Sequence, residues 1–479
     1  MITFLVCLAI LIGGYFVYGK IVEKSVVLND KNSTPAVRLE DGVDYMPMPW
    51  HKVFLIQFLN IAGTGPIFGA IMGALFGPVA FLWITFGTIF AGGVHDFLSG
   101  VISMKHNGTS VSEIVGIYLG DGMKSVMRVF SVILLILVGT VFVTSPAGLL
   151  TSMTGIDKNI WVAVIIIYYM LATVLPVDKV IGKIYPVFGA ALLFMAIGLC
   201  GAMFVGHFNG SMTMPEMTLQ NLHPDGLSIF PFLFTTIACG AISGFHATQS
   251  PMMARCIHKE SESKKVFYGA MVVEGIVALI WCAVTIAFFG DSLSIQNALN
   301  EYGGQSGVVG MLSKDLLGPL GAVLAVLGVV ACPITSGDTA FRSARLTIAD
   351  SFKIKQEGLK NRFVLAIPLF AVCIFLTTID FNIIWRYFAW SNQTLAAIFL
   401  WAATVYLVKN KSNYWMTLIP ATFMSAVCTA YILQAPEGFK LASGFSNIVG
   451  VVVAAGLFLV FLMNVGKIKT SEIQDLAAE

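Results

Sequence analysis

The sequence predicts an all-α membrane protein that crosses the bilayer about 13 times and contains two five-helix repeats of opposite orientation. Three observations predict this fold class. Apolar runs of about 20 residues, the length that spans a hydrocarbon core, recur along the whole chain. Only 11% of the residues are charged, against roughly 25% in soluble domains. Two of the apolar runs, five runs apart, are interrupted by glycine and polar residues.

Each predicted span is an apolar run that polar or charged residues bound. The thirteen runs cover about 2–19, 51–75, 78–103, 125–150, 160–177, 180–206, 228–252, 266–290, 316–345, 362–379, 383–408, 413–433 and 445–466. The first run lacks a basic leader and a small-residue cleavage site, so we expect a retained helix rather than a signal peptide.

The basic residues predict one orientation of these spans. Alternate loops carry all but four of the 28 Lys and Arg residues, and cytoplasmic loops are the ones enriched in such residues. The opposite loops keep Lys158, Lys314, Arg386 and Lys440. We therefore expect the N-terminus outside and the C-terminus in the cytoplasm.

Two spans contain residues that interrupt a helix where no water can satisfy the freed backbone. The second span contains "GTGP" and the seventh contains "TIACGAISGFHATQSP". The residues that interrupt them are Gly63, Thr64, Gly65, Gly240, Ser243, Gly244 and His246. Such gaps are tolerated only where protein or a water-filled cavity surrounds them. Because five is odd, spans five apart have opposite topology, as in inverted repeats that share a central site.

The interruptions predict four parts of the chain. Residues 1–49 form an extra helix and a cytoplasmic loop, and residues 50–227 form the first five-helix repeat. Residues 228–410 form the inverted second repeat, and residues 411–479 form two further helices and a cytoplasmic tail. The alternative is that the glycines merely let neighbouring helices pack closely.

The interruptions also predict a chemistry. Freed N–H groups at the start of a half-helix attract an anion, and freed carbonyl groups hold a cation. A small carboxylate that moves together with H⁺ or Na⁺ fits both. Thr335 and Ser336 add hydroxyls in an apolar span, and such oxygens suit a hard monovalent cation. They could equally bond the carbonyls of their own helix.

Two carboxylates lie at matching positions of the repeats. Asp96 and Glu274 each fall in the second span of their half, and a charge there costs at least about 2.5–3.5 kcal/mol. We expect them on opposite sides of the central site, as carriers of the coupling proton, or as partners of helix ends. His95 and His246 are deep enough to carry a proton or simply to be hydrogen-bonded. Lys183 could replace Na⁺ as a positive charge, or anchor its helix at the interface.

A third polar group lies in the span 383–408. Arg386 is near its outer end, and Asn392 and Gln393 lie deeper. We expect Arg386 to bind a substrate carboxylate, to close an outer gate by pairing with an acidic residue, or to reach the interface beside Trp385 and Trp390. Asn392 and Gln393 complete the candidate substrate site.

Other kinds of site are not indicated. The eight cysteines form no CxxC pair and lie mostly in apolar runs, so we expect packing residues rather than disulfides or a metal site. No nucleophile–base pair, phosphate-binding loop, metal-ligand cluster or nucleic-acid patch is present in the sequence pattern, so we expect no enzyme and no cofactor. The expected partners are a small-molecule substrate and the lipid bilayer.

Several stretches together resemble the carbon starvation protein A family. They are "DGVDYMPMPWHKVFLIQFLNIAGTGPIFG" (41–69), "GGVHDFLSG" (92–100), "CGAISGFHATQSP" (239–251), "TSGDTAFRSARLTIAD" (335–350) and "WRYFAWSNQTLA" (385–396). The resemblance implies a bacterial inner-membrane transporter that takes up peptides or pyruvate under nutrient limitation. It also implies kinship with the amino acid–polyamine–organocation superfamily and a leucine-transporter-like fold. That fold would place substrate beside Gly63, Thr64, Gly65, Gly240 and Ser243, and a cation near Thr335 and Ser336.

Two further function classes stay open on the sequence. A transporter-shaped nutrient sensor would bind its solute without moving it, but it needs a signalling module, and the tail after Val465 spans only about 14 residues. A membrane-embedded enzyme needs paired catalytic groups. Cation-coupled import by alternating access is the leading hypothesis.

Overall fold

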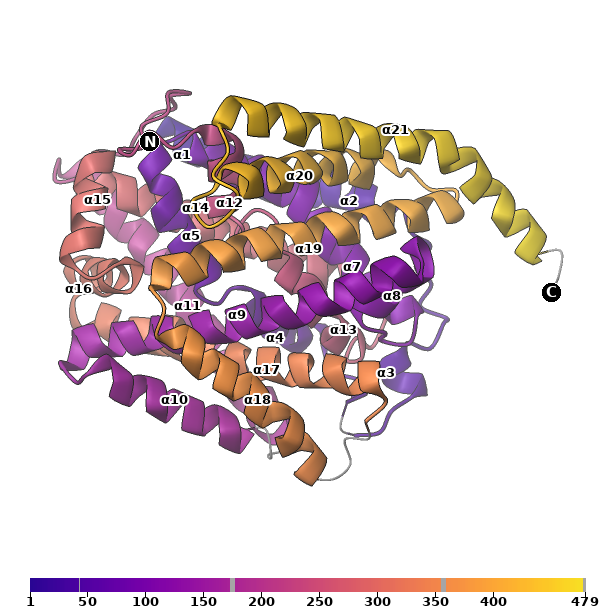
Figure 1. Ribbon diagram of the computed structural model, residues 1–479. Coiled ribbons are helices and arrows are strands. Elements are labelled where there is room, and N and C mark those ends of the chain that lie inside the picture. The colour runs from indigo at the N-terminus through magenta and orange to yellow at the C-terminus, as the bar shows by residue number, and fades with distance from the viewer. Residues whose placement is uncertain (43, 173–176, 355–358, 477–479) are drawn as a thin grey trace.

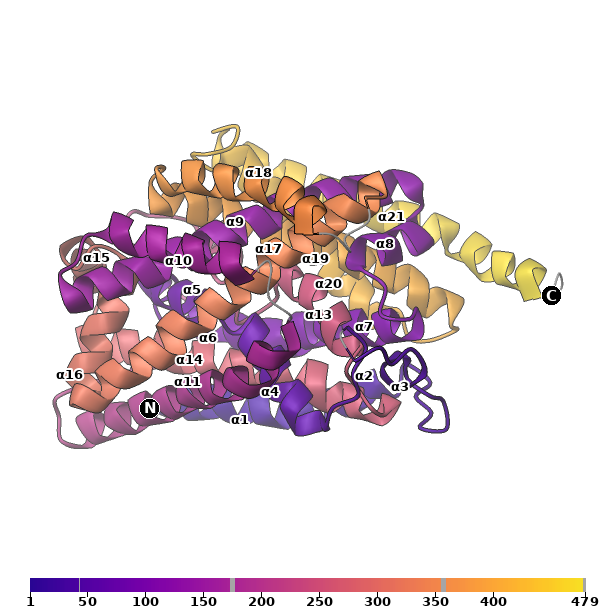
Figure 2. The same ribbon diagram turned by 90° about the horizontal axis from the view of Figure 1, so that it is seen from below.

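The computed structural model describes residues 1–42, 44–172, 177–354 and 359–476, and these residues form a bundle of long helices (Figure 1). Helices α9, α19, α20 and α21 run lengthwise beside one another. The two termini lie at opposite ends of the bundle in both views (Figures 1 and 2). Within the described residues, β pairing is limited to one bridge, between Met48 and Ile257.

The described residues of the first half of the chain contain eleven α-helices, ten before residue 173 and one that begins at Val177. The label η marks a 3₁₀ or π-helical turn. The elements are α1 (Ile2–Phe16), α2 (Tyr18–Glu23), α3 (Pro35–Arg38), α4 (Trp50–Ile61), α5 (Gly65–Gly73), η1 (Ala74–Phe76), α6 (Ala80–Leu82), η2 (Trp83–Gly92), α7 (Gly93–Lys105), α8 (Val111–Leu119), α9 (Asp121–Thr154), α10 (Lys158–Ala172) and α11 (Val177–Phe208).

The second half repeats the alternation of short and long helices. Its elements are η3 (Ile229–Leu233), α12 (Phe234–Thr236), α13 (Gly244–Ala254), η4 (Glu260–Glu262), η5 (Lys264–Tyr268), α14 (Gly269–Phe289), α15 (Ser292–Glu301), α16 (Gln305–Ala325), η6 (Val326–Val330), α17 (Ala331–Phe352), α18 (Leu359–Thr377), α19 (Phe381–Lys409), α20 (Trp415–Gln434) and α21 (Ser443–Leu476).

The predicted fold class is confirmed. The described residues contain 10 helices long and apolar enough to cross a membrane, and the bent pair α4 and α5 makes an eleventh. The shorter apolar helix α10 and the segment from η3 to α13 fill the two remaining predicted places. The ninth span starts earlier than predicted, at Gln305, and kinks at Gly318. The predicted boundaries at 49/50, 227/228 and 410/411 fall between helices, but the division into four parts stays a prediction.

Both predicted interruptions are present as gaps between half-helices. Helix α4 ends at Ile61 and α5 begins at Gly65, with a bend of 49° between them. Pro66 lies in the first turn of α5, where its missing N–H costs no hydrogen bond. Helix α12 ends at Thr236 and α13 begins at Gly244. The extended backbone of Ser243 leads into α13.

The two interruptions touch each other in the core. A Cβ atom on Gly65 would lie 2.5 Å from both Cβ and Sγ of Cys239. Gly240 has a φ of +89°, the left-handed region that favours glycine, and a Cβ there would lie 2.5 Å from that of Ala278 and 3.6 Å from that of Pro66. The glycines therefore permit a backbone approach that larger residues would prevent. The two gaps, far apart in sequence, become one place in the fold.

At the end of the bundle that carries the basic loops, a strap packs on the loop that follows α13. The strap consists of residues 25–42 and 44–49 and contains α3. Met46 and Met48 donate backbone hydrogen bonds to the carbonyls of Arg255 and Cys256. Helices α3 and α8 mark this end, and α15 and α10 mark the other (Figure 1).

Candidate functional site

A chain of four ionisable side chains crosses the core beside the second interruption. His95 Nδ1 lies 2.8 Å from Asp96 Oδ1, and Asp96 Oδ2 lies 2.8 Å from Nδ1 of His246. The other ring nitrogen of His246, Nε2, lies 3.4 Å from Glu274 Oε2. All four side chains are 0% exposed. The predicted carboxylates thus lie on opposite sides of one histidine.

Close helix contacts bring these residues together. Asp96 lies in the first turn of α7, His246 in the first turn of α13, and Glu274 on α14. Gly92, just before α7, lets the chain approach the second interruption, because a Cβ there would lie 2.2 Å from the carbonyl oxygen of Ala241. Ser99 of α7 also donates to Ser250 of α13, at 2.8 Å. The small side chains therefore let α7 pack closely on α13 and the second interruption, and this brings Asp96 next to His246.

Part of this charged chain lacks well-formed hydrogen bonds, although His246 and Glu274 form an ion pair. His246 Nε2, His95 Nε2 and both carboxylate oxygens of Glu274 are buried without a hydrogen bond within the described residues. A buried polar group left unpaired costs about 1–3 kcal/mol. Such groups in a membrane bundle indicate a functional site, because packing alone would replace them with apolar residues.

The loose backbone of the second interruption is satisfied by α19. Asn392 Oδ1 accepts the backbone N–H of Phe245 at 2.6 Å, and its Nδ2 donates to Ser243 Oγ at 2.9 Å. Gln393 Nε2 donates to the carbonyl oxygen of Phe234 at 2.8 Å. Asn392 therefore caps the start of α13, and Gln393 binds the first residue of α12. Their predicted contact with substrate stays a prediction.

The first interruption faces hydroxyl and thiol groups of α17. Ser336 Oγ lies 3.2 Å from the carbonyl oxygen of Leu59 and 3.0 Å from that of Cys332, on its own helix. Thr335 donates to the carbonyl of Cys332 at 2.7 Å. The bond within the helix, left open by the sequence, is thus present. Freed carbonyls and hydroxyls also lie together there, as a monovalent cation requires.

An outer cavity of about 760 Å³ opens at the end away from the basic loops. It reaches from Lys158 and Asp380 to Thr235 and Thr236, at the end of α12. Arg386 lines this cavity, and its Nε donates to Oε2 of Glu437 at 2.9 Å. One of the three expectations for Arg386 was that it pairs with an acidic residue, and Glu437 is such a partner.

The other predicted residues lie deeper than the outer cavity. Thr64 and Ser243 are fully buried at the junction of the interruptions. Gly63 packs on the ring of Phe142, 2.8 Å from where its Cβ would be. Lys183 falls in α11, but its side chain lies outside the described residues.

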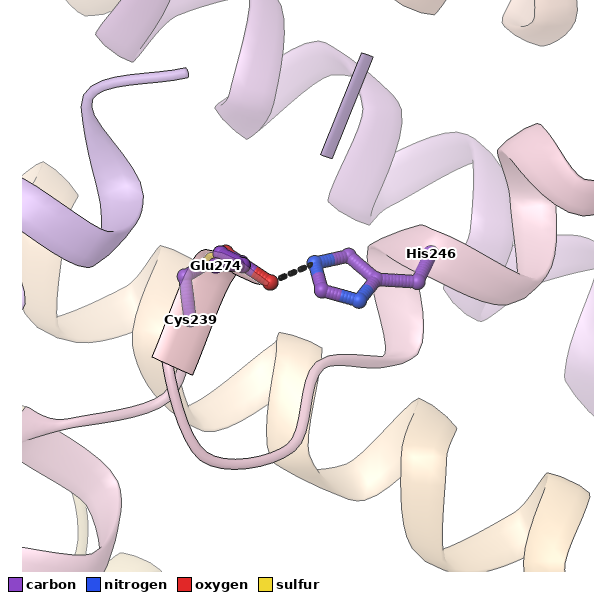
Figure 3. A group of neighbouring side chains, drawn as sticks. All are labelled: Cys239, His246 and Glu274. Atoms are coloured by element: carbon purple, nitrogen blue, oxygen red, sulfur yellow. Dashed lines mark ion pairs between the residues drawn. The ribbon is translucent and has the colours of Figure 1, made fainter. Parts of the chain in front are cut away.

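Sequence reasoning missed four residues of this region. Glu437 could have been suspected as an acid in the last outer loop. Gln57 and Asn60 are buried on α4, shortly before the first interruption, and both amide atoms of Gln57 and Oδ1 of Asn60 lack hydrogen bonds within the described residues. Their three-residue spacing, which places them on one helix face, was a visible signal. Cys239 lies within 4.8 Å of ligand atoms of His246 and Glu274 (Figure 3). The spacing in the sequence did not indicate this grouping, because these residues meet only through tertiary packing.

The chain matches the model of a known protein family. The family model described as "Carbon starvation protein CstA" matches residues 1–154, 144–303 and 303–431. An uncharacterized membrane protein of Haemophilus influenzae is 45% identical over 350 residues, which cover 63% of this chain and 94% of that protein.

Two relatives have names that state an activity. The peptide transporter CstA of Bacillus subtilis is 28% identical, covering 96% of this chain and 95% of that protein. The pyruvate/proton symporter BtsT of Escherichia coli is 24% identical, covering 88% of this chain and 79% of its own length. Both names denote transporters.

Solved structures show the same fold at low sequence identity. A manganese transporter of Eremococcus coleocola superposes with a TM-score of 0.54 at 12% identity, covering 92% of this chain and 99% of that one. The transporter MhsT, in complex with L-phenylalanine, has a TM-score of 0.52 at 12% identity, covering 86% and 98%. The leucine-transporter-like fold implied by the sequence resemblance is thereby confirmed.

Proposed function

Because the chain belongs to the carbon starvation protein CstA family, we propose that this multi-pass membrane transporter imports pyruvate, another small carboxylate or short peptides, by alternating access coupled to H⁺ or Na⁺. One observation carries the proposal. The two interrupted helices meet at Gly65 and Cys239, beside a buried chain of ionisable groups. Interrupted helices at the interface of inverted repeats are where such transporters bind substrate and coupling ion.

The buried chain favours H⁺ as the coupling ion. His246 lies between Asp96 and Glu274, so one proton can be held on either side of its ring. When a carboxylate or imidazole gains or loses a proton, its charge changes, and so does the free energy of keeping it buried. Protonation is thereby coupled to the movement of the helices that bury or expose it. His95, bonded to the far oxygen of Asp96, extends the chain.

Na⁺ is the alternative coupling ion, and a specific geometry supports it. Ser336 and Thr335 lie beside the carbonyl oxygens of Leu59 and Cys332. Oxygen ligands of this kind suit a hard cation. The two candidate ion sites lie at different interruptions, so separate ion gradients distinguish them.

The outer cavity carries charges of both signs. Lys158 and Arg386 could attract a carboxylate, and Asp225 and Asp380 could attract an ammonium group. Pyruvate needs only the first kind of partner, whereas a peptide with free ends uses both. The relatives carry both kinds of name, because one is called a peptide transporter and another a pyruvate/proton symporter.

The basic loops support insertion in the bacterial cytoplasmic membrane with the N-terminus outside. The C-terminal helix α21 leaves the bundle at the end marked by α3 and α8 (Figure 1). In this orientation the strap lies on the cytoplasmic side and the outer cavity faces the incoming substrate.

Uptake by the purified full chain in proteoliposomes tests the proposal. Labelled pyruvate and a labelled dipeptide are supplied under an inward H⁺ gradient or an inward Na⁺ gradient, imposed separately. We expect accumulation of one of these substrates above its external concentration under one gradient. Binding without accumulation would instead identify a sensor, and a chemically altered label would identify an enzyme.

A further inference from the structure

We propose that Cys239, His246 and Glu274 form a binding site for a thiophilic divalent transition-metal cation of the zinc type. The residues come from three pieces of the structure: the second interruption, the first turn of α13, and α14. Figure 3 shows the carboxylate of Glu274 and the thiol of Cys239 on the same side of the imidazole of His246. This site goes beyond transport of an organic solute.

The geometry and chemistry of the three groups suit such an ion. Their ligand atoms all lie within 4.8 Å of one another, and all three residues are buried. Thiolate, imidazole and carboxylate are the zinc ligands of proteins, and three of them leave the fourth tetrahedral position open. A proton relay has no need of a thiol, and a hard cation such as Na⁺ or Mg²⁺ prefers oxygen.

The surroundings of His246 prepare its Nε2 atom as a ligand. Asp96 Oδ2 lies 2.8 Å from Nδ1, so the carboxylate accepts a hydrogen bond from Nδ1–H and leaves the Nε2 lone pair facing Glu274. A carboxylate that holds the far ring nitrogen is the usual support of a metal-bound histidine. Asp96 is itself held by His95.

Buried atoms without well-formed hydrogen bonds give a second indication of a ligand. His246 Nε2 and Glu274 Oε2 contact each other at 3.4 Å, and neither they nor Glu274 Oε1 makes a well-formed hydrogen bond within the described residues, although both side chains are 0% exposed. The thiol of Cys239 makes long sulfur contacts, 3.6 Å to Ser243 Oγ and 3.7 Å from Asn392 Nδ2. A cation among the three would satisfy all these atoms at once, and the displaced thiol proton would pass to solvent.

A bound ion would also join parts that the proposed transport cycle must move. It would tie the loop of the second interruption to α13 and to α14. Because metal bonds fix the distances among their ligands, occupancy would hold the interruption in one arrangement. We therefore expect the ion to arrest transport. This consequence rests on the proposed function, whereas binding itself does not.

Metal titration of the purified full chain tests the site directly. Chelator-stripped protein in detergent is titrated with Zn²⁺, and with Co²⁺ while the near-ultraviolet thiolate-to-metal absorption is recorded. We expect about one ion per chain and a thiolate band. Cys239→Ser should lose the band and weaken binding at least about tenfold, and Asp96→Asn should weaken binding about 10–100-fold.

A matched variant controls for loss of a buried thiol. Cys282 lies on α14, fully buried and outside the cluster, so Cys282→Ser should keep both the band and the affinity. Absence of a band in the unaltered protein, or equal affinities of Cys239→Ser and Cys282→Ser, would overturn the site. If Cys239→Ser does not fold, Cys239→Ala gives the same comparison without a buried hydroxyl.

An uptake measurement separates this site from the proposed function. Zn²⁺ should inhibit uptake by the unaltered protein, and Cys239→Ser should resist inhibition when compared with its own zinc-free rate. Binding without inhibition would overturn the arrest but keep the site. Failure of uptake in every protein would count against the transport proposal, and the titration would still decide the metal site.

Discussion

The two interrupted helices occupy matching places in the repeats but are surrounded by different chemistry. The first, between Ile61 and Gly65, faces the hydroxyls and thiol of α17. The second, between Thr236 and Gly244, faces two carboxylates and a histidine. The sequence offset that relates Asp96 to Glu274 relates Phe68 to His246. Both carboxylates therefore converge on a histidine that only one repeat supplies.

This difference teaches that an inverted repeat specifies geometry rather than chemistry. Each half supplies a helix end at mid-bilayer, because the backbone gap needs only glycine and a neighbour that caps it. The side chains around each gap can then specialise. In the proposals above, one gap binds a hard cation and the other carries protons or a thiophilic metal. The following experiments challenge this comparison, from the largest expected effect to the smallest.

The contact between the interruptions should be indispensable for binding. In Gly65→Leu, the first added carbon would lie 2.5 Å from Cys239, so the two gaps cannot approach. We expect loss of substrate binding in a protein that stays monodisperse in size-exclusion chromatography. Gly201→Leu is the matched control, because nothing lies within 4 Å of its Cβ position. Normal affinity in Gly65→Leu would place the substrate elsewhere.

The charged chain should carry the driving force. Asp96→Asn and Glu274→Gln remove its carboxylates, and a hydrogen bond to a charged group contributes about 1.5–3 kcal/mol. We expect proton-driven accumulation to fall at least about tenfold in each variant, while substrate exchange at equal concentrations survives.

A surface carboxylate provides the control for these two variants. Asp291→Asn, at the start of α15, removes an exposed acid and should leave accumulation intact. Unchanged pH-dependent accumulation in both core variants would remove the charged chain from the mechanism and would erase the contrast between the two interruptions.

The first interruption should affect Na⁺ dependence alone. Ser336→Ala removes the hydroxyl beside the carbonyl of Leu59, and one such interaction contributes about 1 kcal/mol. If Na⁺ drives uptake, its half-saturating concentration should rise about fivefold while the response to an imposed H⁺ gradient is unchanged. Thr339→Ala is the control, because its hydroxyl bonds the Ser336 carbonyl within α17. Equal effects of the two variants would argue against a cation site.

The cap on the second interruption should contribute to stability. Asn392→Ala leaves the backbone N–H of Phe245 without its acceptor, which costs about 1–2 kcal/mol. We expect a lower thermal unfolding temperature in detergent, with partial recovery in Asn392→Asp, which keeps the acceptor. Asn410→Ala, at the far end of α19, should change it less. A stable Asn392→Ala would mean that another group caps α13.

Much of the fold was predictable because it follows from local properties. Membrane spans need only apolar runs of sufficient length, and both gaps were visible as glycine clusters within such runs. Asp96, His246 and Glu274 could be proposed because a charge in an apolar run is costly and therefore conspicuous. Their separate prediction did not show that His246 lies between the two acids.

Other parts of the site could not be predicted from sequence. The sequence did not indicate that Asn392 bonds Ser243 and Phe245, which lie more than a hundred positions away, and its contact with substrate stays a prediction. Cys239 resembled the other buried cysteines until packing placed it beside His246. The pairing of Arg386 with Glu437 likewise depends on how α19 lies against the loop after α20.

The sequence by itself determined the membrane spans, the two gaps, and which ionisable residues enter the bilayer. The free energy of transfer into the bilayer and the backbone conformation both depend on short segments, so these features can be predicted from the local sequence. Only the tertiary structure decided which side chains face which gap. That choice depends on angles and contacts among helices distant in the chain, where a side chain's neighbours, rather than its identity, set what it can bind.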